Sequence, residues 1–123
     1  MDINQDRLIQ IFFELVSINA VSKQEKPVAD YIQKFLKRNG IQVFEDLAGE
    51  IVRGTSGNLI AKIHSPGNTA PSQFCLTAHM DTVKPTTGIN PQIQNGKICS
   101  DGLTILGADN RAGIALILYL VES

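Results

Sequence analysis

The sequence is short of several features that mark large classes of protein. Its net charge is only −1 over 123 residues, and acidic and basic residues are interspersed, so there is no basic face for nucleic acid and no polybasic membrane anchor. No apolar run approaches the roughly 20 residues of a membrane-spanning helix. Residues 1–7 lack the cationic start and apolar core of a signal peptide. Neither nucleic acid nor a membrane is therefore an expected partner.

Cysteine is also scarce. Cys75 and Cys99 lie in strand-like contexts and do not form a C-x-x-C pair, which indicates reduced cysteines in a cytoplasmic protein. The hydrophobic content of 43% and the charged content of 19% are ordinary for a folded soluble protein, so disorder is not expected. A chain of this length is at most one small domain, large enough for a core.

The spacing of apolar residues predicts two helices at the start of the chain. A helical period runs over about residues 6–17. A second helix is expected to begin near Glu25, because Pro27 is tolerated only in a first turn, and to end at Gly40. Ser22 and Glu25 are candidates for a capping box, although that box would place Pro27 deeper in the helix.

Beyond this point the apolar pattern alternates as in strands. Strands are predicted over three stretches: 41–45, 58–64 and 74–78. A polar loop, 65–72, precedes the last of them. The Asn-Gly pair within residues 93–98 predicts a hairpin with a type I′ turn. A final helix is expected just after Asp109 and is apolar on nearly every side, so it should be buried.

This order of elements is typical of an α/β fold with three layers, α/β/α. Such sheets bind ligands beyond the carboxyl ends of their strands, and His79 and Asp109 both fall at such ends. An imidazole is a good zinc ligand whose second nitrogen is commonly held by a carboxylate. Side chains at i and i+2 of an extended segment share a face, so Asp81 is expected to support His79 while Met80 points into packing. Asp109 would be able to place one oxygen on each of two metal ions.

Each of these residues also has a structural interpretation. A single histidine such as His79 is usually a satisfied or surface residue, and an aspartate at a helix start is often only a favourable charge. His64 also follows an apolar strand but has no carboxylate nearby, so we expect it to be structural. Asp101 and Gly102 are expected to form a turn, and Arg111 to be a solvated helix residue. Spacing alone leaves the metal site and the structural interpretation open.

Two longer stretches favour the metal site. The sequence L-T-A-H-M-D-T-V at 76–83, followed by S-D-G-L-T-I-L-G-A-D-N-R-A-G at 100–113, resembles the co-catalytic zinc exopeptidase family. That family includes peptidase T, carboxypeptidase G, aminoacylase and succinyl-diaminopimelate desuccinylase. The second stretch is most similar to the peptidase T-like branch. The opening helices and the S-x-x-E pattern near Ser22 are similar too, so the resemblance spans essentially the whole chain.

The resemblance implies a role for each candidate residue. His79 would ligate one zinc ion, Asp81 would orient His79, and Asp109 would bridge two zinc ions and be followed by a cis peptide bond to Asn110. Asn110 and Arg111 depart from the more common Asp-Lys, and neither is an expected ligand. The implied reaction is hydrolysis of an amide bond in short peptides or N-acyl amino acids. Aminopeptidase activity of the peptidase T type is the leading expectation, and deacylase activity is the second.

The resemblance further implies that residues 1–123 are the N-terminal portion of a metallopeptidase catalytic domain. In the family, a Glu-Glu pair, the remaining ligands and an inserted lid or dimerisation domain follow the bridging aspartate, and a homodimer would form through that inserted domain. Fourteen residues follow Asp109, so we expect this chain alone to bind zinc weakly and to hydrolyse nothing. The alternative function is non-catalytic, as a truncated remnant or a docking domain. A third interpretation is an unrelated small α/β binding domain.

Overall fold

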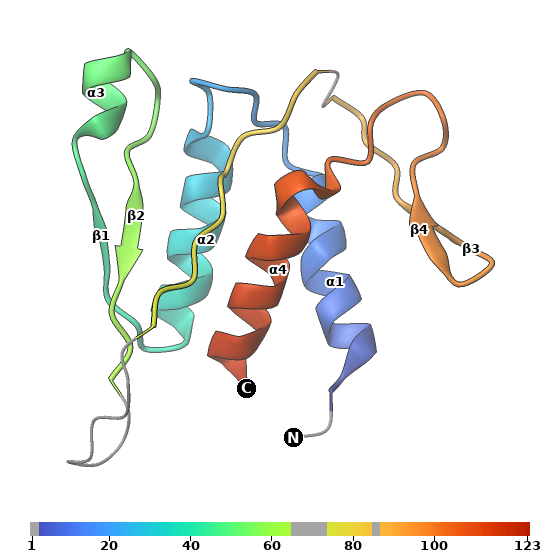
Figure 1. Ribbon diagram of the computed structural model, residues 1–123, viewed down its shortest axis with the longest axis horizontal. Coiled ribbons are helices and arrows are strands. Elements are labelled where there is room, and N and C mark those ends of the chain that lie inside the picture. The colour runs from blue at the N-terminus through green and yellow to red at the C-terminus, as the bar shows by residue number, and fades with distance from the viewer. Residues whose placement is uncertain (1–2, 65–73, 85–86) are drawn as a thin grey trace.

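The computed structural model describes residues 3–64, 74–84 and 87–123 (Figure 1). The described elements, in chain order, are α1 (Gln5–Val16), α2 (Lys26–Arg38), β1 (Val43–Glu45), α3 (Ala48–Val52), β2 (Leu59–Ala61), β3 (Gln92–Gln94), β4 (Lys97–Cys99) and α4 (Ala108–Glu122). The polar loop predicted at 65–72 lies outside the described residues. Helices and strands are mixed, as an α/β chain requires, and the layering into α/β/α stays a prediction.

Local sequence explains where α1 and α2 begin. The side chain of Asn4 accepts a hydrogen bond from the Arg7 amide at 3.1 Å, which caps the first turn of α1. Pro27 lies in the first turn of α2, as predicted. The capping box was wrong: Glu25 makes no side-chain cap bond, and the Ser22 hydroxyl donates to Asp81 instead.

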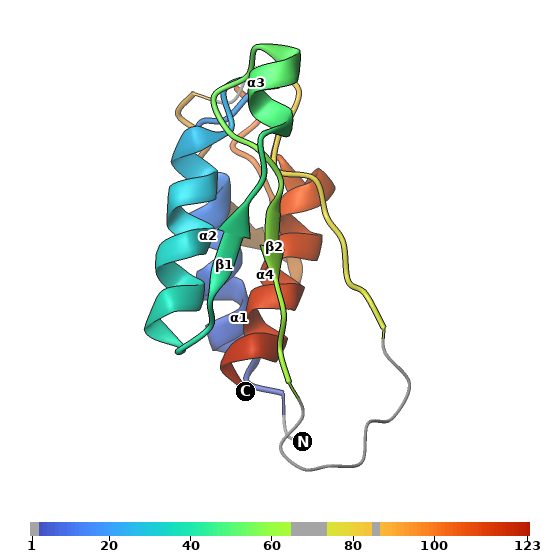
Figure 2. The same cartoon turned by 90° about the vertical axis from the view of Figure 1, so that its left-hand side faces the viewer.

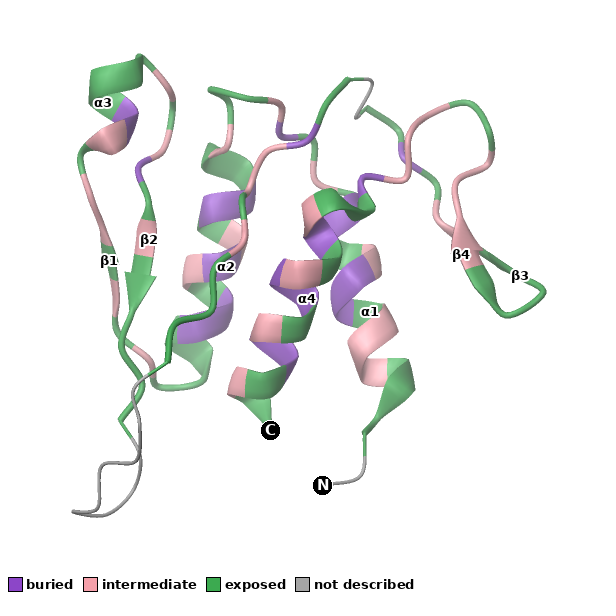
Figure 3. Ribbon diagram, viewed as in Figure 1, coloured by how far each residue is buried: buried purple, intermediate pink, exposed green. Residues whose placement is uncertain are grey.

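The core lies between α1, α2 and α4, whose facing sides are buried (Figure 3). On α4 the buried apolar residues are Ile114, Ala115, Leu118 and Tyr119. The all-round burial predicted for this helix was wrong, because Leu116 and Leu120 remain about half exposed, at 49% and 47%. Among the described elements, α1 and α2 make the principal contacts with α4, and they cover only one side of it.

The strands form two separate antiparallel pairs, β1–β2 and β3–β4. In the first pair Val43 and Leu59 pack against the core, while Phe44 and Ile60 lie opposite each other with exposed side chains. The strand predicted at 74–78 was wrong: those residues carry no strand pairing among the described residues. Figure 2 shows that this stretch, in yellow, lies apart from β2, so no neighbouring strand supplies its hydrogen bonds.

The hairpin prediction is confirmed. Asn95 and Gly96 join β3 to β4 with φ values of 52° and 74°, the left-handed pair that a type I′ turn requires. Cys99 lies in β4, whereas Cys75 lies outside any strand, and both thiols are free. None of the described helices has the length and apolarity that crossing a membrane demands.

Candidate metal centre

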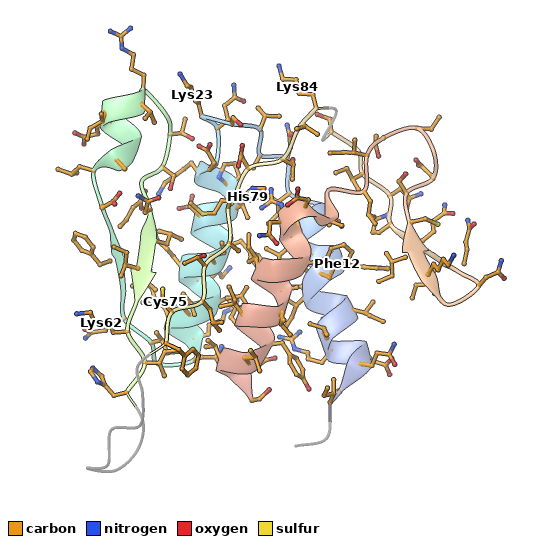
Figure 4. The ribbon with its side chains drawn as sticks, viewed as in Figure 1. Phe12, Lys23, Lys62, Cys75, His79 and Lys84 are labelled. Atoms are coloured by element: carbon orange, nitrogen blue, oxygen red, sulfur yellow. The ribbon has the colours of Figure 1, made fainter. Side chains whose placement is uncertain are left out.

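The candidate site forms where three distant segments of the chain meet. Residues 20–22, just after α1, run beside residues 81–82 and form an isolated parallel bridge between Val21 and Thr82. The Thr82 amide donates to the Ala20 carbonyl at 3.0 Å. This pairing brings the Ser22 hydroxyl to Oδ2 of Asp81. Figure 4 shows His79 beside the start of α4, which is the third segment.

The start of α4 has an irregular backbone. Gly107 precedes the helix with a φ of 74°, and Asp109 and Asn110 have non-helical angles within it. The peptide bond between Asp109 and Asn110 is cis, as the resemblance implied. The Asn110 side chain accepts a hydrogen bond from the Gly113 amide at 3.1 Å, so it caps the regular part of the helix.

His79 lies between two carboxylates. Its Nδ1 is 3.1 Å from Oδ1 of Asp81 and 3.0 Å from the Asp81 carbonyl oxygen. Its Nε2 is 2.9 Å from Oδ1 of Asp109. The structure therefore brings together all three predicted site residues, and Met80 packs against the core as expected. Their roles in binding and catalysis stay predictions.

The cluster is open to solvent on the side of Asp109. The exposed fraction is 93% for the Asp109 side chain, 50% for His79 and 33% for Asp81. The hydrogen bond to Asp109, with further ones to the carbonyl and carboxylate of Asp81, raises the pKa of His79 against partial desolvation. The hydrogen bond from Ser22, together with those to His79, lowers the pKa of Asp81. Both shifts favour an ionised carboxylate next to a positive group.

Arg111 is where the structure departs most from the sequence-based expectation. It was predicted to be solvated, but only 1% of it is exposed. One guanidinium nitrogen, Nη2, donates to the Ile18 carbonyl at 3.4 Å, while Nε and Nη1 are buried without a hydrogen-bond partner among the described residues. Burial lowers the pKa of Arg111 to about 10, and the charge of Asp81 opposes that shift. Arg111, two residues after Asp109, therefore packs against the segment that follows α1.

The structure also shows where the other residues singled out in the sequence lie. Asp101 and Gly102 form the predicted turn, in which Oδ1 of Asp101 accepts from the Leu103 amide at 3.0 Å. His64 is exposed and lies beyond the end of β2. Sequence reasoning missed Ser22 as part of the site. Its only signal was the S-x-x-E pattern, which was interpreted as a helix cap.

The donor atoms present are sufficient for part of a metal site only. Across residues 3–64, 74–84 and 87–123, no group of three or more His, Cys, Asp or Glu side chains is arranged to hold a metal ion. Two donors do fit: Nε2 of His79 and Oδ1 of Asp109 lie 2.9 Å apart, and the two ligand atoms on one tetrahedral zinc are about 3.3 Å apart for bonds of about 2.0 to 2.1 Å. A shift of a few tenths of an ångström would bring both onto one ion.

Comparison with known proteins shows that the chain is similar to parts of peptidases. No protein-family model matches the chain. In the solved structures, the chain resembles the aminopeptidase PepT from Bacillus cereus ATCC 10987, with a TM-score of 0.85 and 37% identity over 97% of this chain and 32% of that one. It also resembles a tripeptidase from Staphylococcus aureus Mu50, with a TM-score of 0.90 and 34% identity over 98% of this chain and 32% of that one. The chain has the fold of part of a peptidase.

A curated relative matches over a similar share of its length. The uncharacterized protein YqjE of Bacillus subtilis strain 168 is 36% identical over 120 residues, which are 98% of this chain and 32% of that protein. The chain thus spans about a third of the length of each of these relatives. At these identities the likeness extends to sequence as well as to fold, so a peptidase-related origin is supported for this peptidase-like domain.

Proposed function

We propose that this chain carries part of the active site of a zinc-dependent exopeptidase that cleaves short peptides. The observation that carries the proposal is the convergence of His79, Asp81 and Asp109 from two segments, with His79 held between the carboxylates. The resemblance to an aminopeptidase and to a tripeptidase supports short peptides as substrates. Hydrolysis of N-acyl amino acids is the second candidate activity.

In this proposal each residue has a separate task. With a metal ion bound, Asp81 would accept a hydrogen bond from Nδ1–H of His79, so that the Nε2 lone pair would be available to the ion. Asp109 contributes a carboxylate that is 93% exposed and therefore free to share a second oxygen with another ion. When bound, zinc would polarise a substrate carbonyl and increase the acidity of water. Zinc in proteins takes four ligands, or three and a water, so further donors are required beyond this pair.

Metal binding by the chain is the first test. Equilibrium dialysis with Zn²⁺, at a pH where free imidazole is neutral, should show weak binding to the purified chain. His79→Ala should abolish it, and His64→Ala, which removes the other histidine, should leave it unchanged. An equal decrease in binding in both variants would show that the two imidazoles contribute equally, and would reject a specific site at His79.

Catalysis is tested by transplantation. The chain would replace the matching third of the Bacillus cereus aminopeptidase, and the hybrid would be assayed on tripeptides and on N-acyl amino acids. We expect tripeptide hydrolysis that Asp109→Asn abolishes. Preference for N-acyl amino acids would favour the deacylase. A folded hybrid that binds zinc and hydrolyses neither substrate would favour the non-catalytic alternative.

A further inference from the structure

The hydroxyl of Ser22 makes a contact that the proposed function does not use. Asp81 has two carboxylate oxygens: Oδ1 faces Nδ1 of His79 at 3.1 Å, and Oδ2 accepts the hydrogen bond from Ser22. With both oxygens engaged, rotation of the carboxylate about its side-chain bonds would break one of the two contacts. The serine therefore influences the orientation of the Asp81 carboxylate relative to the imidazole.

The backbone around Ser22 is fixed by contacts that do not involve its hydroxyl. On one side, the Thr82 amide donates to the Ala20 carbonyl at 3.0 Å. On the other side, the Thr55 amide donates to the Lys23 carbonyl at 3.1 Å. Removal of the hydroxyl should thus leave residues 20–23 in place. The hydrogen bond to Asp81 acts on the orientation of a side chain, and it is not needed to join the segments.

The carboxylate is not the only acceptor available to His79. The Asp81 carbonyl oxygen is 3.0 Å from Nδ1, so the imidazole would keep one partner if the carboxylate turned away. A main-chain carbonyl is neutral, however, whereas a carboxylate raises the basicity of a ligating imidazole. The orientation of Asp81 therefore decides which of these two acceptors sets the donor strength of Nε2.

From these contacts we propose that Ser22 is a positioning residue that holds the Asp81 carboxylate on His79 and thereby strengthens His79 as a metal ligand. The consequence for metal affinity rests on the proposed function, whereas the effect on the conformation of Asp81 does not. Ser22 touches neither proposed ligand atom directly and acts only through Asp81. Ser22 and Asp81 lie 59 residues apart in the sequence.

The test compares three variants of the full chain. Ser22→Ala removes the hydroxyl, and Ser22→Thr keeps it. Ser56→Ala is the matched control, because the Ser56 hydroxyl also donates to a carboxylate, that of Glu45, at 2.9 Å and away from the site. Circular dichroism first establishes that each variant is folded, and two readouts follow.

The first readout is the χ1 rotamer distribution of Asp81 in the metal-free protein, from three-bond NMR couplings. We expect one dominant rotamer in the wild type, in Ser22→Thr and in Ser56→Ala, and averaging over rotamers in Ser22→Ala. A single unchanged Asp81 rotamer in a folded Ser22→Ala variant would overturn the proposal, because the hydroxyl would then not determine the orientation of the carboxylate.

The second readout is the zinc dissociation constant. Loss of a group that orients a ligating histidine weakens metal binding by about 10- to 100-fold. Because Ser22 acts one step further out, we expect a weakening of about 3- to 10-fold in Ser22→Ala and none in the other two variants. Equal affinity in all variants would overturn the proposed effect on ligand strength. If the wild type binds no zinc, the proposed function fails, and the rotamer result alone decides the positioning role.

Discussion

Arg7 and Glu122 lie 115 residues apart in the sequence and form a two-point ion pair that joins α1 to α4. The Nε and Nη2 atoms of Arg7 each lie 2.7 Å from a different carboxylate oxygen of Glu122. Next to this pair, the Asn4 amide donates to the Tyr119 hydroxyl at 2.6 Å. Two polar contacts therefore close one end of the interface whose apolar part forms the core.

The ion pair should make stability depend on pH in the acid range. The hydrogen bond from Arg7 lowers the pKa of Glu122 below its ordinary value of 4.5. Its stabilisation is therefore fully present above that value and is lost as the pH falls through the folded-state pKa. A double-mutant cycle with Arg7→Ala and Glu122→Ala, measured by urea unfolding, should give a coupling of about 0.5 to 1 kcal/mol at pH 7. The coupling should decrease as the pH falls below 4.5 and through the folded-state pKa, and a constant value would contradict the prediction.

Arg111 should reduce the stability of the described fold. Its guanidinium is buried with two nitrogens that lack hydrogen-bond partners among the described residues, and replacing such a buried charge by an apolar side chain of similar size is often stabilising. We expect Arg111→Met to raise the free energy of unfolding by about 1 to 3 kcal/mol. Arg38→Met, on the exposed end of α2, is the control and should change it little. A loss of stability in Arg111→Met alone would show that the charge is satisfied.

Gly113 should respond to substitution in the sense opposite to most helical glycines. Replacement of a helical glycine by alanine usually stabilises by about 1 kcal/mol. Here a Cβ at position 113 would lie 2.3 Å from Oδ1 of Asn110, the atom that caps the helix. Displacement of the cap should make Gly113→Ala destabilising by about 1 kcal/mol.

The Asn110→Ala background isolates this effect. Without the amide there is nothing for the new Cβ to meet at that point, so adding Gly113→Ala to Asn110→Ala should restore the usual gain in stability. Thermal unfolding of the four proteins measures both changes. The same sign for Gly113→Ala in both backgrounds would rule out the contact with Asn110 as the cause.

The exposed face of the β1–β2 pair should affect solubility more than stability. Phe44 is 64% exposed and Ile60 is 46% exposed, and they lie opposite each other. Phe44→Thr should raise the concentration at which light scattering begins, because it removes an apolar patch that favours association. It should change the free energy of unfolding by less than about 0.5 kcal/mol. The Val43 side chain packs against the core. Val43→Thr should therefore destabilise the protein, and it should improve solubility less than Phe44→Thr does.

The sequence was sufficient for those parts of the fold that depend on local chemistry. Pro27 and Gly40 mark the limits of α2, and Asn95 and Gly96 define the hairpin, because each has backbone angles that few other residues share. The short helix α3 was missed, since its five residues follow no apolar period and are anchored by the Asp46 side chain, which accepts from the Ala48 amide at 3.0 Å.

The candidate site was predictable in its residue types but not in its contacts. The i and i+2 positions of His79 and Asp81 follow from extended backbone, and their hydrogen bond was expected. The hydroxyl of Ser22 reaches Asp81 through a pairing of segments 59 residues apart, which no local pattern encodes. Arg111 was assigned to solvent because charged residues are rarely buried. Only the packing of α4 against α1 showed otherwise.

The meeting of three segments at Ser22, Asp81 and Asp109 ties ligand binding to folding. In an unfolded chain these residues are separated by intervals of 59 and 28 positions, so no preformed ligand pair exists there. Any ion that joins His79 to Asp109 would bind the folded state alone and raise its stability by RT ln(1 + [ion]/Kd), about 2.7 kcal/mol at a concentration of 100 Kd. A rise in melting temperature with zinc concentration would then report the affinity of the site without any substrate.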